Sequence, residues 1–296
     1  MTKQQNKYLG IDIGGTTAKY ALITSTGGIM NKGSFETGFR VGLDSFLESL
    51  FRVVDASIGK GIEGIGISCL GIINSESGEI IGGVANMPFL AGLNLKKLLS
   101  EKYHGIPVRI CNDVKAAVRG EQWLGAAKDC QNVFFVSLGT GLGGALVLNS
   151  KVVEGSHFRA GEICYLDFNN DADYIEKYVS TKHVMTITAK ALAIPHLDGF
   201  EFFSKVRQGD GLCIEILDQW VNNLSRLIAN IIIIFDVEKV IVGGGISSEK
   251  DILVPRINQA VNLMIPSEFC NQTVIETAMC TNDAGMLGAV SQFILN

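Results

Sequence analysis

The sequence lacks a long apolar run and any pattern of paired cysteines. Among its 296 residues, the longest apolar run is Ile231 to Phe235, far too short to span a bilayer. The N-terminus carries no charged-then-apolar leader, so we expect a cytoplasmic protein with no membrane partner. The seven cysteines form no C-x-x-C pair and are an odd number, which favours reduced core thiols over a disulfide framework.

An excess of positive charge is also missing. Lysine and arginine number 25 against 30 aspartates and glutamates, and the resulting net charge of −5 argues against nucleic acid as a partner. Apolar residues, in contrast, make up 47% of the chain, which is enough for a sizeable core in one large or two ordinary domains.

The chain is organised around the stretch from Val133 to Leu148. Its first part, Val133 to Leu138, is an apolar run typical of a buried strand, and Gly139-Thr140-Gly141 then makes a tight turn. The letters fit G-x-G-x-x-G, but a second apolar strand follows the glycines where a dinucleotide-binding fold needs a helix, so this is a β-hairpin. The backbone N–H groups of such a turn can hold phosphate. On this segment alone, a hairpin turn without a ligand is an equal alternative.

The same pattern occurs near the start of the chain. A strand from Tyr8 to Ile13 leads through Gly14-Gly15-Thr16-Thr17 into a second strand, Lys19 to Thr24, and a third. In both halves this three-strand meander precedes alternating helices and strands, which predicts two similar α/β lobes. Two phosphate-sized turns predict one polyphosphate in a cleft between the lobes, and they favour a nucleotide over an empty turn.

Apolar spacing and turn residues predict the remaining elements. Helices are expected over residues 41–58, 95–103, 114–124, 174–192, 209–235, 252–264 and 284–295. Strands are expected over residues 62–67, 108–111, 239–242 and 273–277, with a loop or hairpin over 72–81.

Two carboxylates adjoin these features. Asp113 follows a strand and opens a helix, where it is either the helix N-cap or, beside two phosphate turns, a base for an attacking hydroxyl. Asp12 ends the first strand and is either a turn-stabilising residue or a Mg²⁺ site that acts through water. Lys19 is either a phosphate contact or a solvated lysine.

Two further features allow two interpretations each, and a third, Glu176, has a purely local explanation. Glu162 is a surface charge or a ligand of sugar hydroxyls, and Glu176 stands in a first helical turn, where the helix dipole alone favours acidic residues. Gly243-Gly244-Gly245 lets the backbone approach a flat ring or serves close packing.

Five motifs together resemble the ROK family of sugar kinases and repressors, within the actin-like and hexokinase-like ATPase superfamily. They are DIGGTTAK (12–19), CNDVKAA (111–117), SLGTGLGGALV (137–147), AGEICY (160–165) and VGGGIS (242–247). The resemblance spans nearly the whole chain and implies two ribonuclease-H-like α/β lobes around an interlobe cleft. It places residues 1–118 and a C-terminal helix near 284–296 in the N-terminal lobe and residues 119–283 in the C-terminal lobe. A homo-oligomer, a dimer, is also implied.

The resemblance also implies roles for individual residues. Asp113 would be the catalytic base, and Asp12 would hold Mg²⁺ through water. The implied sugar ligands are Asn86, Asn112, Glu162, Tyr165 and Glu176. The implied ATP ligands are Gly14, Thr16, Thr17, Thr140 and Gly141 at the phosphates and Gly244 and Gly245 at the adenosine.

The chain departs from the family pattern at two points. Tyr165 occupies the position of a family histidine, and no cysteine-rich zinc loop follows it, so we expect no structural zinc. Only seven residues precede Tyr8, so we expect no DNA-binding helix-turn-helix. The sequence therefore predicts an ATP-dependent kinase acting on a hexose hydroxyl, most simply the 6-OH of glucose, N-acetylmannosamine or a β-glucoside. The alternative is a sugar sensor that binds its ligand without turnover.

Overall fold

The chain forms two compact units. The structure, a computed structural model, describes residues 5–38, 40–168, 173–270 and 272–295. Unit 1 comprises residues 1–128, 154–159 and 283–296, and unit 2 comprises residues 129–153 and 160–282. The lobe boundary predicted at residue 118 falls inside helix α3 (Asp113–Leu124), which lies wholly within unit 1.

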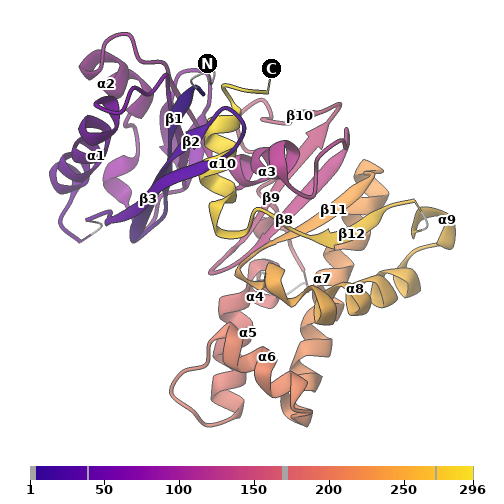
Figure 1. The fold of residues 1–296 in the computed structure, drawn as a ribbon. Helices are drawn as coiled ribbons and strands as arrows, with labels where there is room; N and C mark the ends of the chain where they lie inside the picture. The colour runs from indigo at the N-terminus through magenta and orange to yellow at the C-terminus, as the bar shows by residue number, and fades with distance from the viewer. Residues whose placement is uncertain (1–4, 39, 169–172, 271, 296) are drawn as a thin grey trace. The chain divides into compact units, whose positions relative to one another are not determined.

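Unit 1 is built on a five-stranded sheet with the order β3-β2-β1-β4-β7 (Figure 1). Its strands are β1 (Lys7–Ile13), β2 (Thr17–Thr24), β3 (Ile29–Glu36), β4 (Ile65–Cys69) and β7 (Val108–Asn112). The first three strands are antiparallel, and β4 and β7 run parallel to β1. The predicted loop or hairpin after β4 is a hairpin, β5 (Ile72–Asn74) and β6 (Glu79–Gly82).

Helices complete the core of unit 1. They are α1 (Leu43–Ile58), the 3₁₀ helix η1 (Pro88–Leu90), α2 (Leu95–Lys102), α3 and α10 (Ala284–Ser291). Leu9 and Ile11 of β1 and Phe46 of α1 are fully buried in this core. Helix α10 lies against the sheet and α3 (Figure 1). The approach to α3 is so close that a Cβ atom on Gly288 would lie 1.6 Å from the carbonyl oxygen of Ala116, so only glycine fits there.

Unit 2 repeats the topology of unit 1. Its strands are β8 (Val133–Leu138), β9 (Leu142–Leu148), β10 (Lys151–Val152), β11 (Lys239–Gly244) and β12 (Val274–Thr277). The order β10-β9-β8-β11-β12 again places a three-stranded antiparallel meander beside two parallel strands. The two α/β lobes predicted from the sequence repeat are thereby confirmed.

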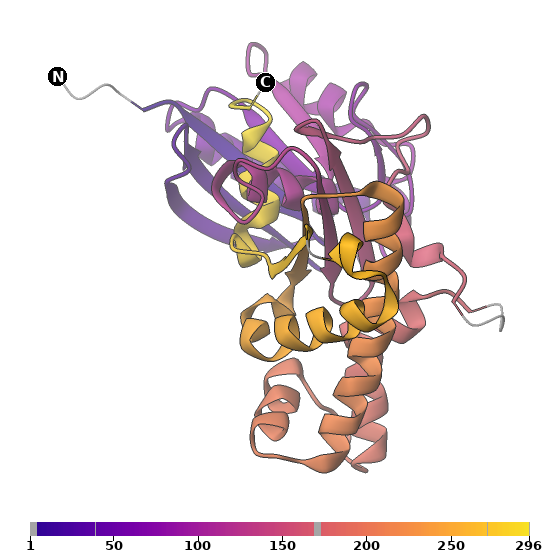
Figure 2. The same cartoon turned by 90° about the vertical axis from the view of Figure 1, so that its right-hand side faces the viewer.

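Most helices of unit 2 pack on the long helix α7. The helices of this unit are η2 (Ile163–Tyr165), α4 (Glu176–Val179), α5 (Thr181–Ala191), α6 (Gly199–Arg207), α7 (Gly211–Phe235), η3 (Gly245–Glu249), α8 (Lys250–Met264) and α9 (Ser267–Cys270), with η4 (Thr281–Asp283) at the junction with unit 1. Helix α8 packs on α7 and crosses it in both views (Figures 1 and 2). Trp220 and Leu224 of α7 are buried against the sheet core. No helix among the described residues has the length and apolar character needed to cross a bilayer.

Two sequence-based expectations for unit 2 are corrected. The single helix predicted over residues 174–192 is broken, because Ser180 adopts an extended backbone and caps α5 by accepting a hydrogen bond from the N–H of His183. Helix α6 was not expected. Its N-terminus is a capping box in which Asp198 and Glu201 accept from each other's backbone N–H groups.

Candidate active site

The first phosphate-sized turn joins β1 to β2 in unit 1. It is closed by a hydrogen bond from the N–H of Gly14 to the carbonyl oxygen of Thr17 (3.2 Å), and Thr37 donates its N–H to the oxygen of Thr16 (3.0 Å). The side chain of Asn86 lies beside this turn, because a Cβ atom on Gly15 would come within 3.6 Å of Asn86 Nδ2. The structure therefore brings a predicted sugar ligand next to the residues predicted to hold phosphate.

Asp12 stands at the end of β1, just before the turn. Ser68 on β4 donates its Oγ–H to Asp12 Oδ1 at 2.6 Å. Burial raises the pKa of the Asp12 carboxyl, and the hydrogen bond from Ser68 and the charge of Lys19 oppose that rise. Among the described residues, no group of three or more histidine, cysteine and acidic side chains could hold a metal ion. A lone carboxylate fits Mg²⁺ held mainly by water and phosphate, and the expectation of no structural zinc stays a prediction.

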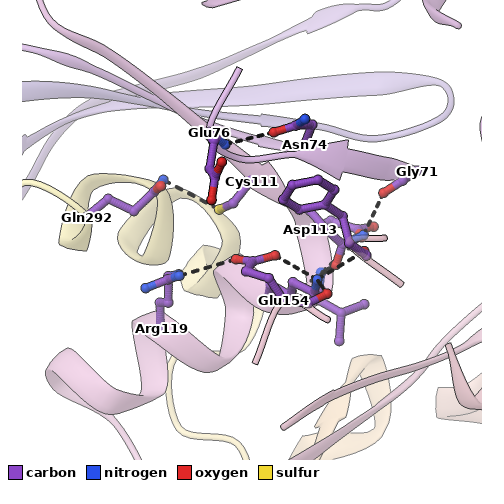
Figure 3. Close-up of polar contacts among 12 residues, drawn as sticks. Gly71, Asn74, Glu76, Cys111, Asp113, Arg119, Glu154 and Gln292 are labelled. Atoms are coloured by element: carbon purple, nitrogen blue, oxygen red, sulfur yellow. Dashed lines mark hydrogen bonds and ion pairs between the residues drawn. The ribbon is translucent and has the colours of Figure 1, made fainter. Parts of the chain in front are cut away.

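Asn112 and Asp113 lie where β7 meets α3, and Asp113 is labelled in Figure 3. Asn112, rather than Asp113, is the N-cap of α3, because its Oδ1 accepts from the N–H groups of Val114 (3.0 Å) and Lys115 (3.1 Å). The Oδ1 of Asp113 accepts from the N–H of Val114 (2.9 Å) and from Asn112 Nδ2 (2.8 Å), and that amide also donates to the oxygen of Gly71. The carboxylate is thus fixed in orientation by its neighbours while another residue caps the helix.

A buried lysine fastens a separate stretch of chain to α3. Lys115 is 3% exposed, and its Nζ donates to Glu154 Oε2 (2.7 Å), to the backbone oxygen of Glu154 (3.2 Å) and to that of Phe158 (3.1 Å). Arg119 reaches the other oxygen of the same carboxylate at 3.5 Å (Figure 3). We call residues 154–159 the strap. It belongs to unit 1, although the chain on both sides of it belongs to unit 2.

Unit 2 contains a cavity of about 840 Å³ beside the second phosphate-sized turn. Its walls are the turn between β8 and β9, helix α5, residues 194–200 at the start of α6, and η3. Of the predicted nucleotide ligands, Thr140 and Gly245 line the cavity. The neighbouring Gly244 packs closely on β8: its φ is +95°, and a Cβ atom there would lie 1.8 Å from the oxygen of Leu138.

Most of this cavity was missed by reasoning from the sequence. The walls supplied by α5 and by residues 194–200 include Lys182, Lys190 and His196. The capping box at Asp198 and Glu201 is the local signal that could have revealed the start of α6. Nothing in the spacing of the preceding residues indicates that they face a cavity.

The loop that carries Glu162 packs directly on the second hairpin. The backbones of Gly144 and Gly161 approach so closely that a Cβ atom on Gly161 would lie 2.2 Å from the oxygen of Gly144. Within the loop, the Cys164 thiol donates to Glu162 Oε2 at 3.8 Å. Burial, then the charges of Glu162 and Glu176, raise the pKa of Cys164 to about 12. The loop thus places the Cys164 thiol in partly buried surroundings near two carboxylates, its own Glu162 and Glu176 of α4.

Tyr165 ends this loop and is largely exposed. Its side chain is 62% exposed, and its ring makes an edge-on contact with that of Tyr174, with centroids 5.4 Å apart. Cys164 and burial, followed by Glu162 and Glu176, raise the pKa of Tyr165. The predicted sugar ligands of unit 2 therefore lie close enough to influence one another electrostatically.

Glu176 contacts the second phosphate-sized turn as well. Its Oε2 accepts a hydrogen bond from the N–H of Leu142 at 2.9 Å, and a Cβ atom on Gly141 would lie 2.6 Å from the same oxygen. Gly141 therefore faces a predicted sugar ligand, and the cavity lies beside Gly139 and Thr140. Each unit pairs a phosphate-sized turn with a carboxylate, an arrangement suited to phosphoryl transfer.

Comparison with known proteins matches the chain to a family model over nearly its whole length. The model described as "ROK family" matches residues 8–294. A β-glucoside kinase from Listeria monocytogenes is 30% identical over 97% of both chains, and a glucokinase from Thermotoga maritima is 29% identical over 96% of both. A crystal structure of a ROK family protein from Streptococcus pneumoniae in complex with sucrose has a TM-score of 0.86 at 27% identity, covering 97% of this chain and 98% of that one.

Proposed function

The chain belongs to the ROK family, and we propose that it is an ATP-dependent sugar kinase that transfers the γ-phosphoryl group of ATP to a hexose hydroxyl. The observation that carries the proposal is the carboxylate of Asp113, fixed at a strand end while Asn112 caps the helix behind it. Ligands of α/β sheets bind at such strand ends. Because Asn112 already caps α3, capping alone does not explain a carboxylate at position 113.

In the proposed reaction, Asp113 accepts the proton of the sugar hydroxyl as that oxygen attacks the γ-phosphorus. The new O–P bond forms while the bond from the γ-phosphorus to the β–γ bridging oxygen breaks, and ADP leaves with that electron pair. The hydroxyl is the 6-OH, as the resemblance implies. Mg²⁺ bound to the phosphates would neutralise their charge, and Asp12 would hold it through water.

The ligands are assigned to residues of both units. The sugar is bound by Asn86 and Asn112 in unit 1 and by Glu162, Tyr165 and Glu176 in unit 2. The phosphates are contacted by Gly14, Thr16, Thr17, Thr140 and Gly141. The adenosine occupies the cavity of unit 2 beside Gly245 and Gly244, the last residue of β11. The volume and the mixed lining of this cavity suit a nucleoside. The predicted interlobe cleft and the dimer stay predictions.

The sugar proposed is a β-glucoside or an N-acetylated hexosamine beside free glucose. Tyr165 stands exposed where relatives with a zinc loop have a histidine, and a β-glucoside kinase and a sucrose-bound protein are among the similar proteins. A sugar that carries a second ring or an acetamido group fits an open, aromatic position better than a closed one.

A coupled ADP-release assay tests the kinase directly. We expect ADP release from MgATP that depends on one of glucose, N-acetylmannosamine or cellobiose. Titration calorimetry with the same sugars separates the alternative, because a sensor would bind sugar without releasing ADP. Sugar binding with no turnover across the panel would replace the kinase by the sensor.

A further inference from the structure

The turn formed by Gly139, Thr140 and Gly141 has two neighbours within unit 2. Gly139 and Thr140 line the cavity proposed for the nucleotide. Glu176 Oε2 fills the space that a side chain on residue 141 would take, only 2.6 Å from that Cβ position. The turn therefore borders both the nucleotide cavity and a carboxylate.

The contact with Glu176 is a directed hydrogen bond. The oxygen accepts the N–H of Leu142, the first residue of β9, at 2.9 Å. A hydrogen bond to a charged acceptor is stronger than a neutral one. The carboxylate thus fixes the backbone at the point where the turn enters β9.

A second bond holds the other end of the same turn. The N–H of Lys182 donates to the oxygen of Gly139 at 3.2 Å, and Lys182 belongs to α5, which follows α4 after Ser180. Helix α4 is itself anchored, because Trp220 Nε1 of α7 donates to the oxygen of Val179 at 2.8 Å. Because α4 is held in place, a shift of the Glu176 side chain acts on the turn through its hydrogen bond to Leu142.

The same carboxylate acts electrostatically on the loop of residues 160–165, called the sugar loop because it carries Glu162 and Tyr165. Its charge, like that of Glu162, acts on Cys164 and Tyr165. A carboxylate has about four lone-pair positions for hydrogen bonds. One oxygen can hold the N–H of Leu142 while a sugar hydroxyl donates to the group.

We propose that Glu176 is a positioning residue that couples the two ligands: a sugar hydroxyl bound to its carboxylate orders the Gly139–Gly141 turn for the nucleotide. The inference rests on the proposed kinase function. A turn already ordered by the first ligand costs the second ligand less ordering, so each ligand strengthens the binding of the other. Because such coupling is reciprocal, one factor describes both directions.

The experiment measures that factor by calorimetry. The Kd of the non-hydrolysable analogue MgAMPPNP is determined without sugar and with a saturating concentration of the panel sugar that gives the highest kcat/KM. For the unaltered protein we expect the sugar to lower this Kd by about tenfold, within the usual range of allosteric coupling.

Gly141→Ala and Gly139→Ala form a matched pair of variants. Both add one methyl group to the same turn at positions without a positive φ. In Gly141→Ala the methyl group displaces Glu176 Oε2, so we expect the coupling factor to fall to within about twofold of unity. In Gly139→Ala the methyl group meets no atom within 4 Å, so the factor is expected to persist whatever the nucleotide Kd itself becomes.

A second route covers the case in which Gly141→Ala no longer binds the nucleotide. Glu176→Asp keeps the charge but withdraws the carboxylate from Leu142 by one methylene, so it too should lose the coupling when the sugar is supplied at a concentration that saturates the variant, whatever its sugar Kd becomes. An unchanged factor in either variant overturns the inference. A factor of one in an unaltered protein that turns over sugar also overturns it, whereas an unaltered protein without turnover refutes the kinase proposal instead.

Discussion

The Asp113 carboxylate accepts two hydrogen bonds from its neighbours, and Asn112 supplies the helix cap beside it. Asp113→Asn is nearly isosteric and should leave the fold and both ligand affinities unchanged. Without a base for the hydroxyl proton, turnover should fall on the order of 100-fold or more. ADP release measures the loss, and calorimetry with sugar and MgAMPPNP checks that binding survives. Near-normal turnover would reduce Asp113 to a structural role.

Cys164 offers a pH-dependent probe of the sugar loop. Burial and the Glu162 charge raise its pKa to about 12, so at pH 8 only about one thiol in 10⁴ is ionised. Iodoacetamide should therefore modify Cys164 slowly, at a rate that keeps rising with pH beyond pH 9. Removing the negative charge in Glu162→Gln should lower the pKa and speed the reaction. Peptide mass mapping measures both rates, and a midpoint near pH 8.5 in the unaltered protein would contradict the prediction.

Tyr165 is expected to influence the choice of sugar. A tyrosine presents a longer side chain and one hydroxyl where zinc-bearing relatives have a histidine. The two side chains differ in length and in the hydrogen-bonding groups that they offer to a sugar, so Tyr165→His should shift kcat/KM toward glucose relative to N-acetylmannosamine and cellobiose. The three kcat/KM values, before and after the substitution, provide the measurement. Strong glucose preference in the unaltered protein, with unmoved ratios in the variant, would leave Tyr165 a packing residue.

At the level of elements, the strap depends on one buried ion pair. The Lys115 side chain is 4% exposed and satisfies three acceptors of the strap. Lys115→Met leaves the Glu154 carboxylate without its closest partner and should lower the free energy of unfolding by about 3 kcal/mol. Thermal unfolding and urea denaturation measure the change.

An exposed pair on another helix provides the control for the strap. Lys97 and Glu101 are about 70% exposed, so Lys97→Ala should change stability by no more than about 0.5 kcal/mol. Replacing both strap partners, in Lys115→Met with Glu154→Leu, should recover part of the loss, because the carboxylate left without Lys115 is then removed. Arg119 loses its 3.5 Å contact with Glu154 in this variant, but its side chain is partly exposed and can be hydrated. Equal effects of Lys115→Met and Lys97→Ala would show that the strap is held by other contacts.

The elements predicted from the sequence are those whose signal is local. Both meanders follow from apolar runs and glycine turns, and Asp113 stands out because a strand and a helix meet there. The break at Ser180 was missed because apolar spacing continues on both sides of it. The hydrogen bond from Leu142 to Glu176 joins residues 34 positions apart, and no local pattern encodes it. The cavity walls could not be predicted for the same reason, because elements far apart in the sequence form them.

For the whole molecule, ligand binding is expected to change the dimensions in solution. The proposed ligands take contacts from both units, so MgAMPPNP and sugar together should compact the protein more than either alone. Small-angle scattering with each ligand and with both measures the radius of gyration. A radius that stays constant in all four conditions would argue against movement of the units.

Helix α10 belongs to unit 1 but is synthesised last, after all of unit 2. It packs on β4 so tightly that a Cβ atom on Gly66 would lie 2.4 Å from the oxygen of Ala289, yet all of unit 2 is translated between these two residues. At about 5–20 residues per second, the first sheet waits on the order of ten seconds outside the ribosome before its last helix is made. During that interval its apolar face is available to chaperones, and a nascent chain stalled before residue 284 would remain aggregation-prone.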